Sequence, residues 1–134
     1  MSATHEAVFR RVIEEGFNRG NFAAWDECFP PTFAEHQYGM SGSLAGFKQA
    51  IAGLRAGVPD LRLTIDEIVE HGDKVWARMT ARGTHGGPMF SHAATNKPFT
   101  ITVIDVCRFS DGKIVEHWGV PDRFALLHQL GLLP

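Results

Sequence analysis

The spacing of the hydrophobic residues changes at Pro59, and this change limits what the chain can fold into. Between residues 44 and 54 the apolar side chains recur every three or four positions, which is typical of a helix with one buried face. Between residues 61 and 66 they alternate with polar side chains, as in a strand that buries one side. Helices therefore come first in the chain, and most of the strands follow them.

The same two periods divide the remaining sequence. Helices are predicted at residues 4–19, after Asn21 as far as Pro30, from the cap Ser43 to Gly57, and after the cap Asp122. Extended segments are predicted at 32–38, 61–66, 74–85, 98–109 and 113–120, with a long excursion at 86–97. Consecutive antiparallel strands between helices predict an α+β domain whose helices cover one face of a sheet. The length of 134 residues fits a single domain, residues 1–134.

Composition excludes several classes of function. A formal charge of −2 offers no basic surface for nucleic acid or for an anionic membrane, and no apolar run is long enough to span a bilayer. The start of the chain lacks the pattern of a secretion signal, so a cytoplasmic protein is expected. Cys28 and Cys107 are far apart and are expected to be buried thiols. The histidines lack metal-binding spacings, so we expect no metal.

The hairpin between the last two predicted strands decides which side chains share a face. With Asp111-Gly112 as a two-residue loop, Asp105 lies opposite Trp118, and His117 points to the other side. With Ser110-Asp111-Gly112 as a three-residue loop and a bulge, Asp105 lies opposite His117. The three-residue loop collects the apolar residues on one face, so we expect that register.

In the expected register Asp105 and His117 form a pair on an otherwise apolar face. Their Cβ atoms would be about 5 Å apart, close enough for the carboxylate to accept a hydrogen bond from the ring. Such a partner orients an imidazole and raises its basicity. The pair is therefore a candidate for general acid/base catalysis.

Four stretches of the sequence resemble a known family. They are FNRGNFAAWDECFPPTF, PDLRLTIDEIVEHGDKV, WARMTARGTHGG and DGKIVEHWGVPDRFALLHQLG. Together they resemble the SnoaL-like polyketide cyclases and ester cyclases of the nuclear-transport-factor-two-like superfamily, over nearly the whole chain. The resemblance implies a cone: a curved antiparallel sheet wrapped around N-terminal helices, with an internal pocket and a closing C-terminal helix. It also implies frequent dimerisation through the sheet.

The catalytic residues of this family are only partly present. The aldol cyclases keep an acid two positions after the histidine that His117 matches, and here that position is Gly119. They keep a pocket histidine where this chain has Asp105. Arg78 aligns with the arginine of the related epoxide hydrolases, but Thr80 and Gly119 stand in place of their two acids. Two interpretations stay open, an Asp-His pair in which the acid has moved and a site without chemistry.

These features lead to two hypotheses of function. The first is a cofactor-independent acid/base enzyme of the cyclase, isomerase, dehydratase or hydrolase type, acting on a small, mostly apolar, cyclic or carbonyl-containing molecule. His117, oriented by Asp105, would take or deliver the proton, and His36 or Tyr38 would stabilise an oxyanion. The alternative is a non-catalytic module of the same fold that binds a small molecule or dimerises.

Further residues are candidates for contact with a small hydrophobic ligand. They are Tyr38, Trp76, Arg78, His85, Gly119 and Asp122, of which Asp122 is also the expected helix cap. The sequence leaves open whether Arg78 or Arg82 faces the pocket. Trp118, with Ile104 and Val106 on the reverse face, predicts a homodimer interface.

Overall fold

Helices and strands follow the order that the change of period predicts. The computed structural model describes residues 4–133. The helices are α1 (His5–Arg11), the wider π-helical turn η1 (Val12–Asn18), the 3₁₀ helix η2 (Phe22–Glu27), α2 (Leu44–Gly57) and α3 (Arg123–Gln129). The strands are β1 (Ala34–Glu35), β2 (Arg62–His71), β3 (Lys74–Thr84), β4 (Pro98–Ser110) and β5 (Lys113–Pro121).

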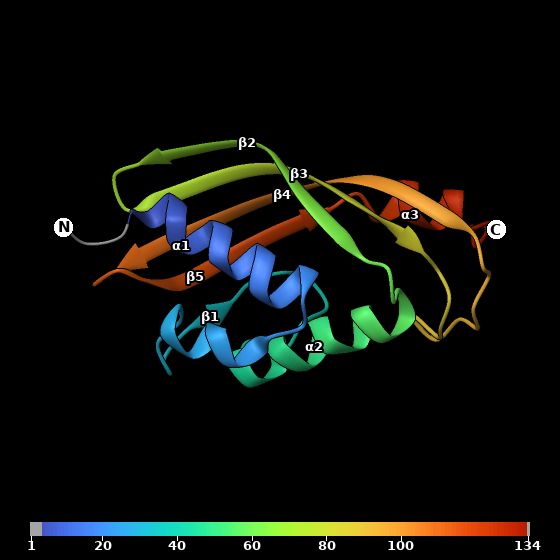
Figure 1. Cartoon of the computed structure of the whole chain (residues 1–134), viewed down its shortest axis with the longest axis horizontal. Coiled ribbons are helices and arrows are strands. Elements are labelled where there is room, and N and C mark those ends of the chain that lie inside the picture. Colours follow the sequence, from blue (N-terminus) through green and yellow to red (C-terminus); the bar gives the residue numbers. More distant parts are fainter. Residues whose placement is uncertain (1–3, 134) are drawn as a thin grey trace.

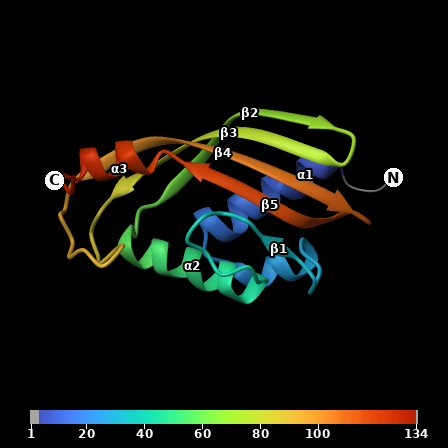
Figure 2. The same ribbon diagram turned by 180° about the vertical axis from the view of Figure 1, so that it is seen from behind.

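The strands form one curved, unclosed sheet in the order β1-β5-β4-β3-β2. Neighbours from β2 to β5 are antiparallel, and β1 pairs in parallel with β5. Figures 1 and 2 show the long strands arching over α1 and α2, with α3 at one end of the sheet. The α+β architecture, with helices on the concave face, is therefore confirmed.

Two of the predicted helix caps are made, and one is not. The Ser43 hydroxyl accepts a hydrogen bond from Gly46 N at 3.0 Å, and Asp122 Oδ1 accepts one from Ala125 N at 3.0 Å. Asn21 precedes η2, but its side chain donates to the Glu15 carboxylate instead of capping the helix. Asn21 therefore stands at the expected start of η2, but the capping hydrogen bond is absent because its side chain is turned toward Glu15.

The core joins the helices to the sheet through aromatic rings. Trp25 is fully buried and donates its indole N–H to Val12 O at 3.1 Å. It packs directly on Gly16, where an added Cβ would lie 2.2 Å from the indole. Phe47 of α2 stacks on Trp25 with 4.7 Å between ring centroids, and on His117 with 5.4 Å. Phe47 therefore connects the hydrophobic core to the polar cluster described below.

The predicted register of the last hairpin is wrong. Ser110 pairs with Lys113, and Asp111 and Gly112 both have positive φ (51° and 77°), so the loop has two residues. A bulge follows at once, because Phe109 pairs with Ile114 and Arg108 already pairs with Glu116.

The bulge nevertheless leaves Asp105 and His117 on the same face, as predicted. It shifts the pairing so that Asp105 lies opposite Gly119 and His117 lies opposite Cys107. The bulge also turns Ile114 into the core, where it is fully buried. The two-residue loop and the bulge are alternatives in the prediction, whereas the chain uses both.

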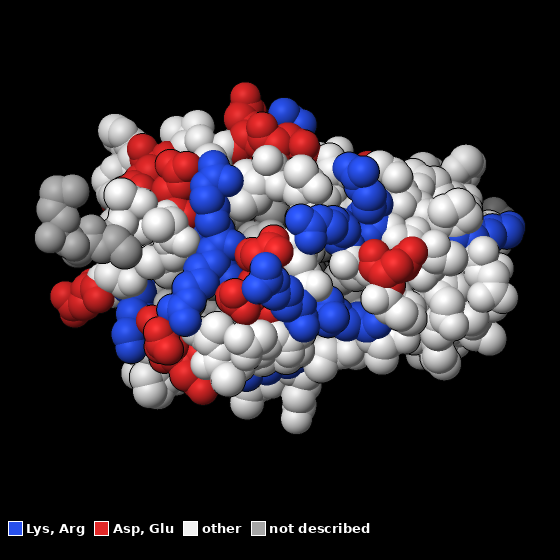
Figure 3. Space-filling model, viewed as in Figure 1, with Lys and Arg blue, Asp and Glu red and all other residues white. Residues whose placement is uncertain are grey.

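The surface shows no separation of charge on the face that carries α1. Figure 3 shows acidic and basic side chains next to each other there. They include the ion pairs Arg10–Glu6 at 3.0 Å and Arg19–Glu14 at 3.5 Å. Both cysteines are buried free thiols, as predicted. None of the helices within residues 4–133 combines the length and the hydrophobicity needed to span a bilayer.

Candidate active site

Three ionisable side chains from three strands or strand ends meet beneath the sheet. They are Glu35 of β1, Asp105 of β4 and His117 of β5, and each is at most 6% exposed. Buried charged groups at this density need partners, because an unpaired charge in an apolar interior is costly. We call these three residues the buried triad.

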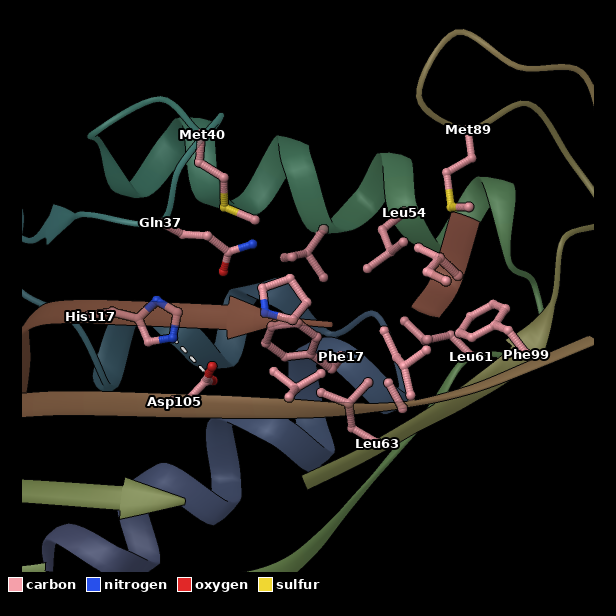
Figure 4. Close-up of a pocket in the computed structure, with 16 residues that line it drawn as sticks. Phe17, Gln37, Met40, Leu54, Leu61, Leu63, Met89, Phe99, Asp105 and His117 are labelled. Carbon is pink, nitrogen blue, oxygen red and sulfur yellow. Dashed lines mark ion pairs between the residues drawn. The ribbon is translucent and has the colours of Figure 1, made fainter. Parts of the chain in front are cut away.

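His117 is the centre of the buried triad, with one carboxylate on each ring nitrogen. Its Nδ1 donates to Glu35, with 2.8 Å to Oε1 and 2.7 Å to Oε2. Its Nε2 lies 3.1 Å from Asp105 Oδ2, the ion pair marked by the dashed line in Figure 4. Glu35 Oε1 also accepts the backbone N–H of Gln37 at 2.9 Å. The imidazole is thus held in a single orientation from both sides.

The two carboxylates keep His117 protonated. Burial by itself lowers the pKa of the imidazole, but the charges and hydrogen bonds of Asp105 and Glu35 outweigh burial and raise the pKa to about 10. At neutral pH His117 is therefore a cation between two acids. A cation with both nitrogens occupied is better suited to orient a carboxylate than to accept a proton.

Glu35 is the member of the triad that the sequence reasoning missed. Its position depends on the short parallel pairing of β1 with β5, in which Glu35 is the register partner of His117. The backbone N–H of His36 donates to His117 O at 2.9 Å and fixes this pairing. Alternate residues of an extended segment share a face, so Glu35 lies on the same side as the buried Phe33. This alternation within residues 32–38 is the sequence pattern that could have indicated a buried Glu35.

An apolar cavity of about 90 Å³ adjoins Asp105 and His117. Its walls come from both helices and strands and are aliphatic or aromatic, as Figure 4 shows. Its three polar side chains are Gln37, Asp105 and His117. Figure 4 shows the Gln37 amide reaching into the space between Met40 and His117. The other walls include Phe17, Ile51, Leu54, Leu63, Ile101 and Leu126.

Gly119 creates the space in which these polar groups meet. A Cβ at this position would lie 2.3 Å from Gln37 Oε1, 2.9 Å from His117 Cε1 and 3.0 Å from Asp105 Oδ1. Any side chain at residue 119 would therefore displace the Gln37 amide or the Asp105 carboxylate. The position contributes to the site by having no side chain.

The two polar candidates from the segment after β1 lie outside the cavity. The His36 side chain points away from the cavity and is 39% exposed to solvent. Its Nε2 lies 2.8 Å from Glu116 Oε2. Its ring stacks on Trp118 with 4.9 Å between centroids. Tyr38 is 91% exposed. Neither is placed to stabilise an oxyanion beside Asp105, because β1 directs alternate residues to opposite sides.

The candidates on β3 face the outer side of the sheet. Trp76 is 52% exposed, and the Arg78 guanidinium lies 3.8 Å from Asp66 and 3.7 Å from Glu67. Arg82 is exposed as well, so neither arginine faces the cavity. The inward positions of β3 are the small or apolar residues between them. Trp118 and Ile104 are exposed on this outer face as well, and the homodimer through Trp118, Ile104 and Val106 stays a prediction.

His85 and Asp122 have structural contacts. His85 is fully buried where β3 leaves the sheet, and its Nδ1 lies 3.0 Å from the Thr95 hydroxyl, which ties the two ends of the 86–97 excursion. Asp122 caps α3. Within residues 4–133, no three potential ligand side chains converge in a way that could hold a metal ion.

Comparison with protein families matches most of the chain to one of them. The sequence profile of the SnoaL-like polyketide cyclases matches residues 7–130. Nogalonic acid methyl ester cyclase of Streptomyces nogalater is 30% identical over 119 residues, 86% of this chain and 89% of that protein. Aklanonic acid methyl ester cyclase of Streptomyces peucetius is 32% identical over 106 residues, 78% of this chain and 72% of that protein. Both named relatives are enzymes.

Solved structures agree with this assignment. TsrD from Streptomyces laurentii superposes with a TM-score of 0.87 at 30% identity, covering 96% of this chain and 95% of TsrD. IdmH from Streptomyces antibioticus superposes with a TM-score of 0.86 at 30% identity, covering 96% of this chain and 99% of IdmH. The curved sheet and its covering helices are therefore shared with these proteins.

Proposed function

Because the chain belongs to the SnoaL-like polyketide cyclase family, we propose that it closes a carbon ring in a polyketide ester, with Asp105 as the general base. Its two curated relatives are cyclases named for methyl esters of polyketide acids, which is the substrate class proposed for this chain. The reaction requires no cofactor, since proton transfers alone carry it. The carboxylate of Asp105 at the polar end of an otherwise apolar cavity is the observation that supports it.

The position of Asp105 suits abstraction of a proton from carbon. One oxygen, Oδ2, faces His117, and Oδ1 points toward the space beside Gly119. A substrate in the cavity would bring the carbon next to its carbonyl group within reach of Oδ1. Holding base and substrate together in this way removes much of the entropic cost of the encounter.

The proposed step balances without any other reactant. Asp105 takes the proton from the carbon adjacent to a carbonyl, and the resulting enolate carbon attacks a second carbonyl of the same molecule. A carbon–carbon bond forms, the second carbonyl becomes an alkoxide, and the alkoxide takes the proton back from Asp105. The product is an isomer of the substrate.

His117 and Glu35 act as positioning residues in this proposal. The imidazolium orients the Asp105 carboxylate, and Glu35 in turn orients the imidazolium. The proposal therefore exchanges the two expected roles. The sequence predicts that His117 transfers the proton and Asp105 orients it, whereas here Asp105 transfers the proton and His117 orients Asp105. His36 has no part, because it lies on the other side of β5.

Gln37 is the group best placed to stabilise the enolate. It is the one neutral polar side chain among the residues that line the cavity within the described part of the chain, and it lies beside both Gly119 and the triad. An amide N–H that donates to the enolate oxygen strengthens as charge develops there.

The test is turnover of nogalonic and aklanonic acid methyl esters by Asp105→Asn. We expect a rate loss of about 100-fold or more, since general base catalysis is typically worth that much. Product is read by chromatography, and proton abstraction is read separately as deuterium uptake from D₂O. Asp73→Asn is the matched control, because Asp73 is half-exposed on the β2–β3 turn and contacts only Lys74 through its side chain.

Two outcomes would contradict the proposal. Turnover by Asp105→Asn at the parent rate would remove Asp105 from the chemistry. If the parent turns over neither ester and Asp105→Asn only lowers the thermal stability, the non-catalytic alternative is supported. In that alternative the triad is a satisfied buried ion cluster.

A further inference from the structure

A groove lies outside the sheet, along the edge of β5 beyond the short β1. Its volume is about 410 Å³, and we call it the edge groove. It is lined by His36, Gln37, Tyr38, Trp118, Gly119, Val120, Pro121 and Arg123. Gln37 and Pro121 also line the inner cavity, so the two spaces share a wall.

We propose that the edge groove is a second substrate subsite, which binds a planar aromatic part of the substrate that carries oxygen substituents. The identity of this molecule as a polyketide rests on the function proposed above. The ring-closing end would enter the inner cavity, and the aromatic end would stay in the edge groove.

The sizes of the two spaces favour such a division. The inner cavity, at about 90 Å³, is smaller than the roughly 300–1,000 Å³ that pockets for drug-sized molecules occupy. The edge groove provides the missing volume next to it. Gln37 and Pro121 line both spaces, and Gly119 at the same edge has no side chain to obstruct passage.

The walls of the edge groove suit a flat aromatic ligand. Trp118 and His36 stack with an interplanar angle of 18°, which makes one aromatic surface from two rings. Trp118 is 37% exposed and Tyr38 is 91% exposed, so both have free ring surface. Aromatic rings bind flat partners by offset or edge contacts with little loss of conformational freedom.

Polar groups at the groove match oxygen substituents on such a ligand. The His117 carbonyl accepts a hydrogen bond from the backbone N–H of His36, so it points away from β4 toward the outer edge of β5. In a strand, the peptide groups of residues two positions apart point to the same edge. Gly119 therefore presents its N–H and C=O to the groove. Arg123 also lines it, and its guanidinium carbon lies 4.5 Å from the centroid of the Phe90 ring.

The same edge is poorly suited to pair with a strand of another protein. An added strand needs a series of free peptide groups, but residue 117 is already paired with β1 and Pro121 has no N–H. Gly119 is left as the one complete peptide edge position between them. A small molecule that uses one N–H fits this edge better than a peptide does.

The experiment measures binding of 1,8-dihydroxyanthraquinone by equilibrium dialysis, with the parent and with Asp105→Asn. We expect both to bind, because binding in the groove does not need the base. Trp118→Ala and Arg123→Ala should each weaken binding about tenfold, and Trp118→Phe should restore it. The matched controls Trp76→Ala and Arg78→Ala remove the same side chains from the outer face away from the groove and should bind like the parent.

Three results would overturn the subsite. The first is absence of binding to the parent. The second is unchanged binding by Trp118→Ala and Arg123→Ala together with loss of binding in Ala81→Leu, which fills the inner cavity. The third is a halved molar mass of Trp118→Ala in light scattering, which would make the groove a contact between copies of the chain. Dialysis does not depend on turnover, so the groove and the role of Asp105 succeed or fail separately.

Discussion

Two clusters with similar groups lie on opposite faces of β5, and they differ mainly in their access to water. On the inner face His117 lies between Glu35 and Asp105, with side chains at most 5% exposed. On the outer face Glu116 lies between His36 and Arg108, with side chains 25–39% exposed. Hydrogen bonds from His36 and Arg108 lower the pKa of Glu116, whereas the charges and hydrogen bonds of Asp105 and Glu35 raise that of His117 against the opposing effect of burial.

The comparison shows that burial, and not residue type, distinguishes the candidate site. The outer cluster can exchange each contact for water, so losing one partner costs little. The inner cluster has no such substitute, so each member depends on the others. Two adjacent pairs, Glu35 with His36 and Glu116 with His117, contribute one residue to each cluster, because neighbouring residues of an extended chain direct their side chains to opposite faces.

The largest expected difference between the clusters is in stability. Glu35→Gln should lower the free energy of unfolding by about 3–5 kcal/mol, because it leaves a buried imidazolium with one acid fewer. Glu116→Gln should lower it far less, because Glu116 and its partners are solvated. Urea unfolding followed by circular dichroism measures both. Equal losses would show that burial does not separate the two clusters.

The next effect is the dependence of stability on pH. The folded pKa of His117, about 10, lies above its ordinary 6.5, so its contribution is complete below pH 6.5 and is lost as the pH rises toward 10. Between pH 6.5 and 8.5 the free energy of unfolding should fall by up to about 1.4 kcal/mol per pH unit. This window lies below the titration of Cys107, whose pKa is raised by burial.

The control for this pH effect is His117→Gln. Its free energy of unfolding should be lower at pH 6.5 and should change much less over the same window. A parent protein with a flat profile between pH 6.5 and 8.5 would show that His117 is not held as a cation.

The smallest effect concerns the space on the inner side of β5. Gly119→Ala should lower turnover of the methyl ester substrates about tenfold, because the new methyl group displaces the Gln37 amide rather than removing the base. Gly53→Ala is the control, since a Cβ there meets nothing within 4 Å. Unchanged turnover of Gly119→Ala would mean that Gln37 has no role in the reaction.

Much of the fold could be predicted from local patterns. The periods of the hydrophobic residues located the long helix α2 and the four long strands, and the oxygen-bearing residues Ser43 and Asp122 marked two helix starts. These features depend on neighbours in the sequence, so the sequence is enough to find them. The continuous helix expected at residues 4–19 instead widens into η1, where Gly16 packs against Trp25, a contact that local patterns do not reveal.

The site was predictable only in part. Asp105 and His117 were found because they are the two ionisable residues on an apolar face, and that face survived an error in the register. The predictions of His36, Tyr38, Trp76 and Arg78 rest on residue type or on the family resemblance, and all four side chains lie outside the cavity. Glu35 was missed because its partner is 82 residues away along the chain.

The sequence by itself determined the order of helices and strands, the caps at Ser43 and Asp122, and the face that holds Asp105 and His117, because these follow from periodicity and from short-range hydrogen bonding. Only the tertiary structure decided that a bulge sets Asp105 opposite Gly119, that β1 brings Glu35 to His117, and that Gln37 enters the cavity. Those outcomes depend on pairing between distant segments and on the exclusion of water from the space they enclose, and neither is encoded in any single stretch of the chain.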